Sequence, residues 1–223
     1  MSCISGITKL PSTIGLVRKL EELDASGCHD LTDEIPKEIG GHSWLKILNL
    51  SNTHILGLPT IISHLSRLQT IDLEPCPELK RIDAPSQQVT PITALPTNIF
   101  TLSRLETLTL CCENVEFFPR VSSCLRMLIL RFLASAQSPD FSNLKNLSTL
   151  TFYGCSIPEF SKVLDLLCMK NLEDICLSNC KLLVKIRGFG KLESLHYLWV
   201  EFCNSMKRML DQSRLREPKK LRV

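Results

Sequence analysis

The chain has 223 residues, of which 44% are hydrophobic and only 6% aromatic, so leucine, isoleucine and valine carry most of the apolar content. Its formal net charge of +3 is too small to indicate a nucleic-acid or membrane-surface partner, and we expect neither. The charge is uneven, because residues 1–100 hold 8 Lys and Arg against 11 Asp and Glu, whereas residues 101–223 hold 18 against 12.

No segment predicts secretion or a membrane span. Lys9 and Pro11 interrupt the apolar pattern near the N-terminus before a signal-peptide core of useful length appears. Arg126 and Arg131 interrupt the best membrane candidate, which stays below the ~18 apolar residues that a span needs. We therefore expect a cytoplasmic or nuclear location and free thiols rather than disulfides at the 11 cysteines.

One pattern of apolar residues recurs along the whole chain. Its template is LxxLxLxxN, with Cys or Thr allowed in the place of Asn. Six of the seven steps between successive units fall in the range of about 20–29 residues that is typical of leucine-rich repeats. The units begin at residues 20, 45, 68, 105, 125, 147, 172 and 195.

The spacing of the template predicts the fold. The two apolar residues of LxL point to the same side of a strand, and the residue between them points to the other side. One such strand cannot bury its leucines, but a stack of them forms a continuous core. We predict an α/β fold: a leucine-rich-repeat solenoid in an open horseshoe arc, with a parallel β-sheet on the concave face. The convex face should be irregular, with short helical turns at most. We expect about eight repeats, plus a partial repeat at each end of the chain.

The step of 37 residues between Leu68 and Leu105 departs from the period. Residues 84–94, with the sequence APSQQVTPITA, are rich in Pro, Ser, Gln and Thr and predict an insertion loop. Such a loop either binds a partner or is a passive part of the surface. We otherwise expect residues 1–223 to form a single leucine-rich-repeat domain.

The style of the repeats resembles that of plant nucleotide-binding immune receptors (NLR type, TIR class). Cys or Thr stands at the Asn place in LEELDASGCHDL, LKILNLSNTHILGLP, LEDICLSNCKLLVKI and LHYLWVEFCNSMKRM, and LPTNIFTLSRLETLTL has the apolar approach to a strand. The resemblance covers the chain from about residue 4 to residue 223. It implies a recognition module in defence signalling that also helps to hold the receptor inactive.

Both ends of the sequence fall inside a repeat, which suggests a fragment of a larger receptor. CISGITKLPSTIGLVRKL corresponds to the convex half of a unit, and LREPKKLRV leads into a ninth strand. The chain on its own should expose apolar end faces and aggregate. No GxxxxGK[ST] motif occurs, so no nucleotide handling is assigned to these residues.

The sequence does not predict an enzyme. It has no GxSxG and no HExxH motif, and no CxxC pair suggests a metal site. The adjacent Cys111 and Cys112 have no histidine predicted beside them, and Cys176 and Cys180 are explained as strand and turn residues. We expect no cofactor, no metal and no catalytic residue.

Residues that flank or split LxL are the best candidates for contact with a partner. They face away from the predicted core, and one of them is a tryptophan, a residue type enriched at binding hot spots. The candidates are Asp24, Asn49, Asp72, Thr109, Met127, Ile129, Arg131, Tyr153, Tyr197, Trp199 and Glu201.

The resemblance implies a protein partner: a pathogen effector, a host protein or the receptor's own nucleotide-binding domain. Two other functions remain open at this point. One is an intracellular signalling scaffold without an immune role, and the other is the substrate-binding region of a ubiquitin ligase. Sequence upstream of Met1 would separate the three, because a P-loop domain, an F-box or neither would precede the repeats.

Overall fold

The computed structural model describes residues 6–76, 81–82, 94–95, 97–111, 120–133, 140–156, 163–206 and 220–222. The chain divides into two compact units, Met1–Cys112 and Glu113–Val223, which we describe in turn. The insertion predicted at 84–94 lies outside the described residues, apart from Ala94. The single domain over residues 1–223 stays a prediction.

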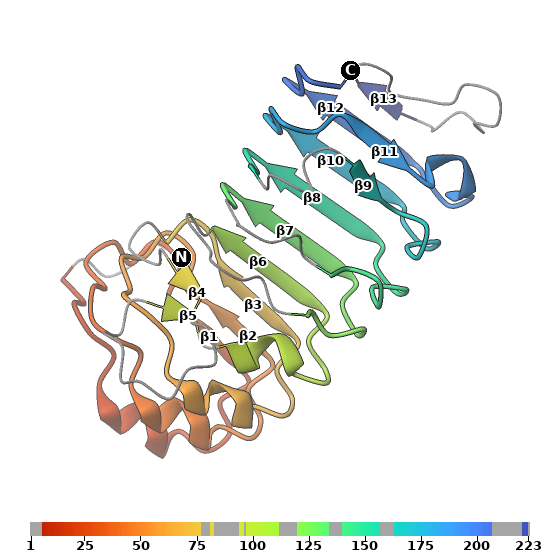
Figure 1. The fold of residues 1–223 in the computed structure, drawn as a ribbon. Coiled ribbons are helices and arrows are strands. Elements are labelled where there is room, and N and C mark those ends of the chain that lie inside the picture. Colours follow the sequence, from red (N-terminus) through yellow and green to blue (C-terminus); the bar gives the residue numbers. More distant parts are fainter. Residues whose placement is uncertain are drawn as a thin grey trace. The chain divides into compact units, whose positions relative to one another are not determined.

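The first unit is built on a parallel sheet with the strand order β1-β2-β3-β6 (Figure 1). Each strand pairs with the next in register, so that Leu23, Leu48, Ile71 and Leu108 lie side by side. A small second sheet pairs β4 with β5. The strands are β1 (Glu22–Asp24), β2 (Ile47–Asn49), β3 (Thr70–Leu73), β4 (Arg81–Ile82), β5 (Ala94–Leu95) and β6 (Thr107–Cys111).

Short 3₁₀ helices form the opposite side of this unit. The first three follow Pro11, Pro36 and Pro59, whose missing N–H costs nothing at a helix start. Each ends with a backbone hydrogen bond to the carbonyl of the isoleucine at its third position. The helices are η1 (Ser12–Leu16), η2 (Lys37–Gly41), η3 (Thr60–His64) and η4 (Thr97–Thr101).

The second unit repeats this plan with longer strands. Its main parallel sheet has the order β7-β8-β10-β12-β13, and β9 pairs with β11 in a small second sheet. The predicted ninth strand is present as β13, which pairs with β12. The elements are β7 (Met127–Arg131), β8 (Thr149–Tyr153), β9 (Val163–Asp165), β10 (Asp174–Ser178), β11 (Lys185–Arg187), η5 (Phe189–Lys191), β12 (Tyr197–Glu201) and β13 (Lys220–Arg222).

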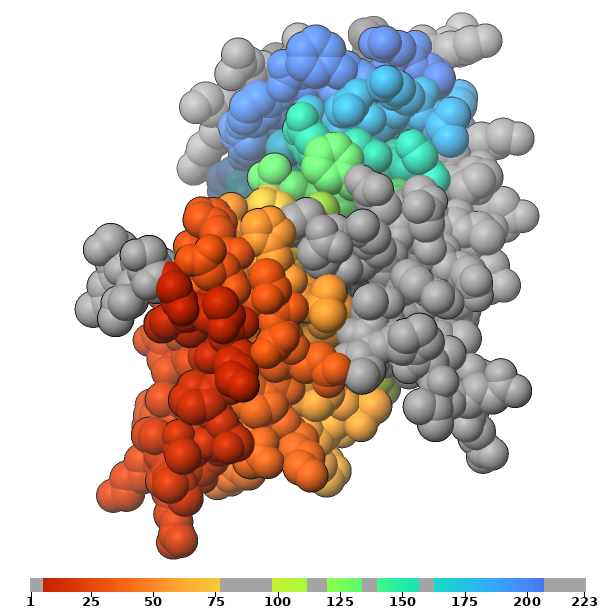
Figure 2. Space-filling model, turned by 90° about the vertical axis from the view of Figure 1, so that its left-hand side faces the viewer, coloured from red at the N-terminus to blue at the C-terminus, as the bar shows by residue number. Residues whose placement is uncertain are grey.

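The core of both units consists of the apolar template positions. Leu45, Leu48 and Leu50 of one repeat are all fully buried, as are Leu172, Ile175 and Leu177 of another. Each of the eight predicted repeats carries a strand of a main sheet, and Figure 2 shows the first coils in sequence order, from red to orange. The prediction of a leucine-rich-repeat solenoid with a parallel sheet and short helical turns is confirmed. No helix among the described residues has the length and apolarity needed to cross a bilayer.

The residue at the Asn place of the template connects neighbouring coils. The thiols of Cys76, Cys155, Cys180 and Cys203 each donate to a backbone carbonyl in the preceding coil, at sulfur–oxygen distances of 3.1, 3.3, 3.7 and 3.6 Å. Thr53 instead donates to the carbonyl of Leu50 in its own coil, at 2.7 Å. These donors, which are buried except for the partly buried Cys203, explain why cysteine and threonine replace asparagine here.

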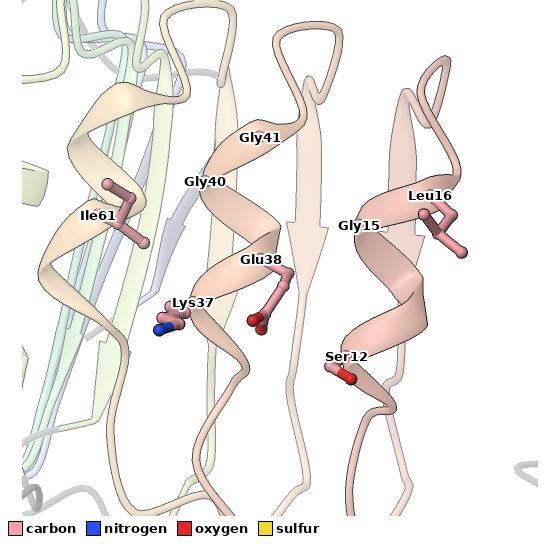
Figure 3. A pocket seen from close by; sticks show the side chains of 8 residues that line it. All are labelled: Ser12, Gly15, Leu16, Lys37, Glu38, Gly40, Gly41 and Ile61. Carbon is pink, nitrogen blue, oxygen red and sulfur yellow. The ribbon is translucent and has the colours of Figure 1, made fainter.

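Two glycines let the 3₁₀ helices of the first unit approach each other (Figure 3). Gly15 in η1 faces Glu38 of η2, and Gly40 in η2 faces Ile61 of η3. A Cβ atom on Gly15 would lie 2.9 Å from the Cβ of Glu38. The same helices line a hollow of about 530 Å³, whose lining includes both glycines and Ile61.

His42 interrupts a column of apolar side chains. It follows η2 at the place that Leu65 occupies after η3, and it is only 1% exposed. Among the described residues, neither of its ring nitrogens has a hydrogen-bond partner. Because burying a polar group without a partner is unfavourable, this histidine should destabilise the first unit.

We predict that Gly40→Ala destabilises the chain by about 1–3 kcal/mol, since the new methyl group would overlap the Cγ1 atom of Ile61. Gly41→Ala is the matched control, because a Cβ at Gly41 meets no atom within 4 Å. Urea denaturation followed by circular dichroism measures both. Equal stability of the two variants would contradict the close packing of η2 against η3.

We also predict that His42→Leu raises the free energy of unfolding by about 1–2 kcal/mol, because it removes two buried nitrogens without partners. The reciprocal change Leu65→His, in the next coil, should lower it by at least as much. The same denaturation measurement applies at pH 8. A loss of stability in His42→Leu would indicate that the histidine ring makes a favourable contact.

Candidate functional site

Each main sheet has one side that packs on the core and one that faces away from it. In β7, β8 and β12, buried and partly buried residues alternate, as the two-residue period of a strand requires. We call the side away from the core the open face. All predicted contact residues lie on it: Asp24, Asn49, Asp72 and Thr109 in the first unit, and Met127, Ile129, Arg131, Tyr153, Tyr197, Trp199 and Glu201 in the second.

In the second unit, parallel register arranges the open face in three rows across four strands. With strands about 4.8 Å apart, each row extends over roughly 14 Å. The middle row is Ile129, Thr151, Cys176 and Trp199. The outer rows are Met127, Thr149, Asp174 and Tyr197 on one side, and Arg131, Tyr153, Ser178 and Glu201 on the other.

In the first unit, the corresponding middle row has a structural role that the sequence did not predict. The side-chain oxygens of Asp24, Asn49 and Asp72 each accept a hydrogen bond from the backbone N–H two residues further on, at 2.9–3.1 Å. These are Asx turns, which close the strand ends. Hydrogen bonds from Ser26 hold the pKa of the Asp24 carboxyl below its ordinary value. Turn formation therefore explains why these three polar residues occur here, and no binding protein needs to be invoked for them.

Thr109 corrects the prediction that every one of these side chains is accessible. It is only 6% exposed, although it belongs to the same row as Asp72. A short side chain in the middle of a five-residue strand is shielded by its neighbours on the same face.

The Arg131 end of the open face combines a cation with aromatic rings. The guanidinium carbon of Arg131 lies 5.2 Å from the ring centroid of Tyr153, within the range of a cation–π contact. The ring of Phe132 meets Tyr153 edge-on, with 5.3 Å between centroids. This arrangement holds the tyrosine ring between a charged and an apolar neighbour.

At the other end of the open face, Trp199 contacts both Tyr197 and Glu201. Its ring meets Tyr197 edge-on at 6.3 Å, and its Nε1 donates to Oε2 of Glu201 at 3.0 Å. The carboxylate thus fixes the orientation of the indole while the ring stays partly exposed. An oriented aromatic side chain loses little entropy when a partner covers it.

Phe132 and Phe202 adjoin the open face and were missed by the sequence analysis. Each directly follows its strand, is 41% and 66% exposed respectively, and has a φ near +53°. That conformation costs a residue with a side chain about 1–2 kcal/mol. The template treats this place as variable, so the only available signal was an aromatic residue where other repeats have glycine or asparagine.

A hollow of about 380 Å³ in the second unit is lined by two carboxylates that already have partners within the protein. Asp140 and Asp165 line it, 25 residues apart. Each accepts a backbone N–H two residues on, and each lies 3.6 Å from an arginine, Arg120 and Arg187 respectively. Turn formation and ion pairing therefore account for both carboxylates.

Three thiols of the second unit, those of Cys176, Cys180 and Cys203, are in an environment that disfavours nucleophilic chemistry. A hydrogen bond with Cys155 and burial raise the pKa of Cys180 to about 12, and a hydrogen bond with Cys180 raises that of Cys203. Burial raises the pKa of Cys176 on the open face. Because the thiolate is the reactive form, these thiols are poor nucleophiles at neutral pH.

Cys28 departs from the expectation of free thiols, since it is disulfide-bonded, whereas the other described cysteines form no disulfide. Cys112, considered beside Cys111 in the sequence, lies outside the described residues. Within the described part of the chain, no group of three or more His, Cys, Asp and Glu side chains could hold a metal ion.

Comparison with known families and proteins agrees with the repeat pattern. Residues 44–65 match the family Leucine Rich Repeat. A segment of 66 residues, 30% of the chain, is 38% identical to TMV resistance protein N of Nicotiana glutinosa. That segment spans only 6% of the length of the tobacco protein. The chain therefore contains a leucine-rich-repeat region, a type of solenoid that binds proteins through an extended sheet face.

Solved structures show the same fold at low sequence identity. The leucine-rich repeat domain of the type III effector XopL has a TM-score of 0.54 and 19% identity, over 92% of this chain and 68% of that one. The plant peptide hormone receptor RGFR1, solved in complex with RGF2, has a TM-score of 0.52 and 18% identity, over 91% of this chain and 37% of the receptor. InlJ from Listeria monocytogenes, whose domain includes a cysteine ladder, has a TM-score of 0.52 and 16% identity, over 96% of this chain and 46% of InlJ.

The raised thiol pKa values predict a loss of stability in alkali. Because the pKa of Cys180 is raised on folding, its contribution is fully present below pH ~9 and is lost as the pH rises towards about 12. We expect the urea midpoint to fall between pH 8 and pH 10 in reducing buffer, and to fall less in Cys180→Ala. Between pH 6 and pH 8 the two proteins should show the same pH dependence. An equally steep alkaline loss in the variant would contradict this role.

Proposed function

We propose that this chain is a recognition module of a plant intracellular immune receptor, and that it binds a protein through the open face of its second unit. The partner is a pathogen effector, a host protein or the nucleotide-binding domain of the same receptor. Cytoplasmic or nuclear location is part of the proposal.

One observation carries the choice of face. In the first unit, Asp24, Asn49 and Asp72 of the middle row close their own strand ends. In the second unit, the same row presents Ile129 and Trp199, which are partly exposed on the side away from the core. Neither side chain can close a turn in this way, and contact with a partner would account for both.

The immune role rests on sequence rather than on the fold. The 38% identity with TMV resistance protein N supports it, together with the use of cysteine and threonine at the place of asparagine. The fold is shared with bacterial proteins and with a hormone receptor, so it does not favour defence over another recognition task. The cited similarity covers a small part of the resistance protein, whose whole activity is therefore not transferred.

The proposed binding face is tested with a panel of purified plant-pathogen effectors and a recombinant nucleotide-binding domain of a resistance protein. Binding of any member should be weakened at least tenfold by the double substitution Ile129→Ala and Trp199→Ala, because the centre of the contact is removed. Trp44→Ala is the control, since Trp44 is 42% exposed and lies outside the strands of the sheet. Binding that survives the double substitution would exclude this face.

The immune assignment has an independent test in the full transcript. A reading frame that continues upstream into a P-loop domain would support it. A frame that continues into an F-box would instead indicate a ubiquitin ligase, and a complete frame with neither would indicate a signalling scaffold.

A further inference from the structure

Six described coils turn in the same way just after the strand of the main sheet. In each, the residue two places after the second apolar residue of LxL has a φ between +53° and +73°, in the left-handed region. Four of the six use residues that tolerate this conformation: Gly27, Asn52, Gly154 and Asn179. The other two use Phe132 and Phe202.

Among the described residues, nothing indicates that Phe202 stabilises the fold. Its side chain is 66% exposed, so it contributes little to the core, and its backbone is in a conformation unfavourable for a bulky residue. Phe132 has a partial reason, because its ring contacts Tyr153 and lies over Gly154, where a Cβ atom would come within 2.7 Å of the ring. It is nevertheless 41% exposed.

We infer that Phe132 and Phe202 are partner-contact residues, and that they anchor an acidic segment bearing large apolar side chains at the edge of the open face. This inference rests on the proposed function, because it extends the same binding face over the turns that follow the strands.

The spacing of the two rings restricts the ligand. Their strands, β7 and β12, are separated in the sheet by β8 and β10, so the rings are about 14 Å apart along the edge. An extended segment advances about 3.3 Å per residue, and therefore its two apolar contacts should be four or five residues apart. Gly154 and Asn179 occupy the equivalent places between the two phenylalanines.

The open face of the second unit carries Arg131 beside Phe132, and Asp174 and Glu201 on the strands nearer Phe202, so an acidic side chain is favoured at the Phe132 end of that segment. Arg131 precedes Phe132 and lies against Tyr153, so a carboxylate of the ligand that reaches this end would meet the guanidinium group. Residues 113–223 also carry 17 Lys and Arg against 11 Asp and Glu, which attracts an acidic partner at a distance. At the Phe202 end, the Glu201 carboxylate accepts a hydrogen bond from Trp199. The ligand is held there by the apolar contact between its own side chain and the Phe202 ring.

The test uses the whole chain and a displayed library of random 12-residue peptides. Selection on the wild-type chain should enrich peptides with two large apolar residues four or five apart and Asp or Glu nearby. A synthetic peptide of the enriched sequence should bind the double variant Phe132→Asn and Phe202→Asn at least tenfold more weakly, and Arg131→Gln should also weaken it. Leu182→Asn, at another exposed apolar residue of this unit, is the control and should bind normally.

Stability provides a second readout that does not depend on any ligand. Because asparagine tolerates the left-handed conformation, Phe202→Asn should raise Tm by about 2–4 °C even as it weakens binding. A fall in Tm would show that Phe202 stabilises the fold and would overturn its assignment as a contact residue. Failure to enrich acidic, apolar peptides would overturn the class of ligand.

The result also separates this inference from the proposed function. If Ile129→Ala and Trp199→Ala abolish binding of the selected peptide while the phenylalanine variants bind normally, the inference is wrong and the proposed face stands. If neither pair of substitutions affects any selected peptide, both are wrong.

Discussion

The structure depends on the fact that no single coil can bury its own leucines. A strand of three to five residues has one apolar side, and that side is covered only when the next coil continues the parallel ladder in register. Each fully buried leucine contributes about 1.5–3 kcal/mol, so the stability of a coil comes mainly from its neighbours. The thiol of Cys180, which donates to a carbonyl of the preceding coil, adds a polar connection of the same kind.

This requirement leaves only certain positions free for recognition. Template residues must be apolar, and the turn after each strand must reverse the chain, for which the first unit uses Asp24, Asn49 and Asp72. In the second unit the same row is released from that task and carries Ile129 and Trp199. Two units with the same backbone plan therefore have middle rows of different character: the first is polar and closes its own turns, and the second presents Ile129 and Trp199 beside Thr151 and Cys176.

The sequence was sufficient to predict the architecture because burial leaves a regular pattern. Each unit start was followed by a strand, and even the short β13 lies where a ninth strand was expected. The sequence was weaker on the site because the template leaves its variable positions undefined. It could not indicate that Asp72 accepts a hydrogen bond from its own turn, that Thr109 is shielded, or that Phe132 has a positive φ. These properties depend on local backbone geometry and on neighbours 20 or more residues away.

The contact between Phe132 and Gly154 has a consequence for how such an array can evolve. Repeats of similar sequence are prone to unequal recombination, which adds, removes or reorders whole coils. Here a coil carrying the phenylalanine requires a coil with glycine at the same place immediately after it, because any Cβ would meet the aromatic ring. Gly40 and Ile61 impose the same kind of adjacency rule on the other side of the first unit. The coils are thus not interchangeable modules, and recombination that separates such a pair would have to be followed by compensating substitutions.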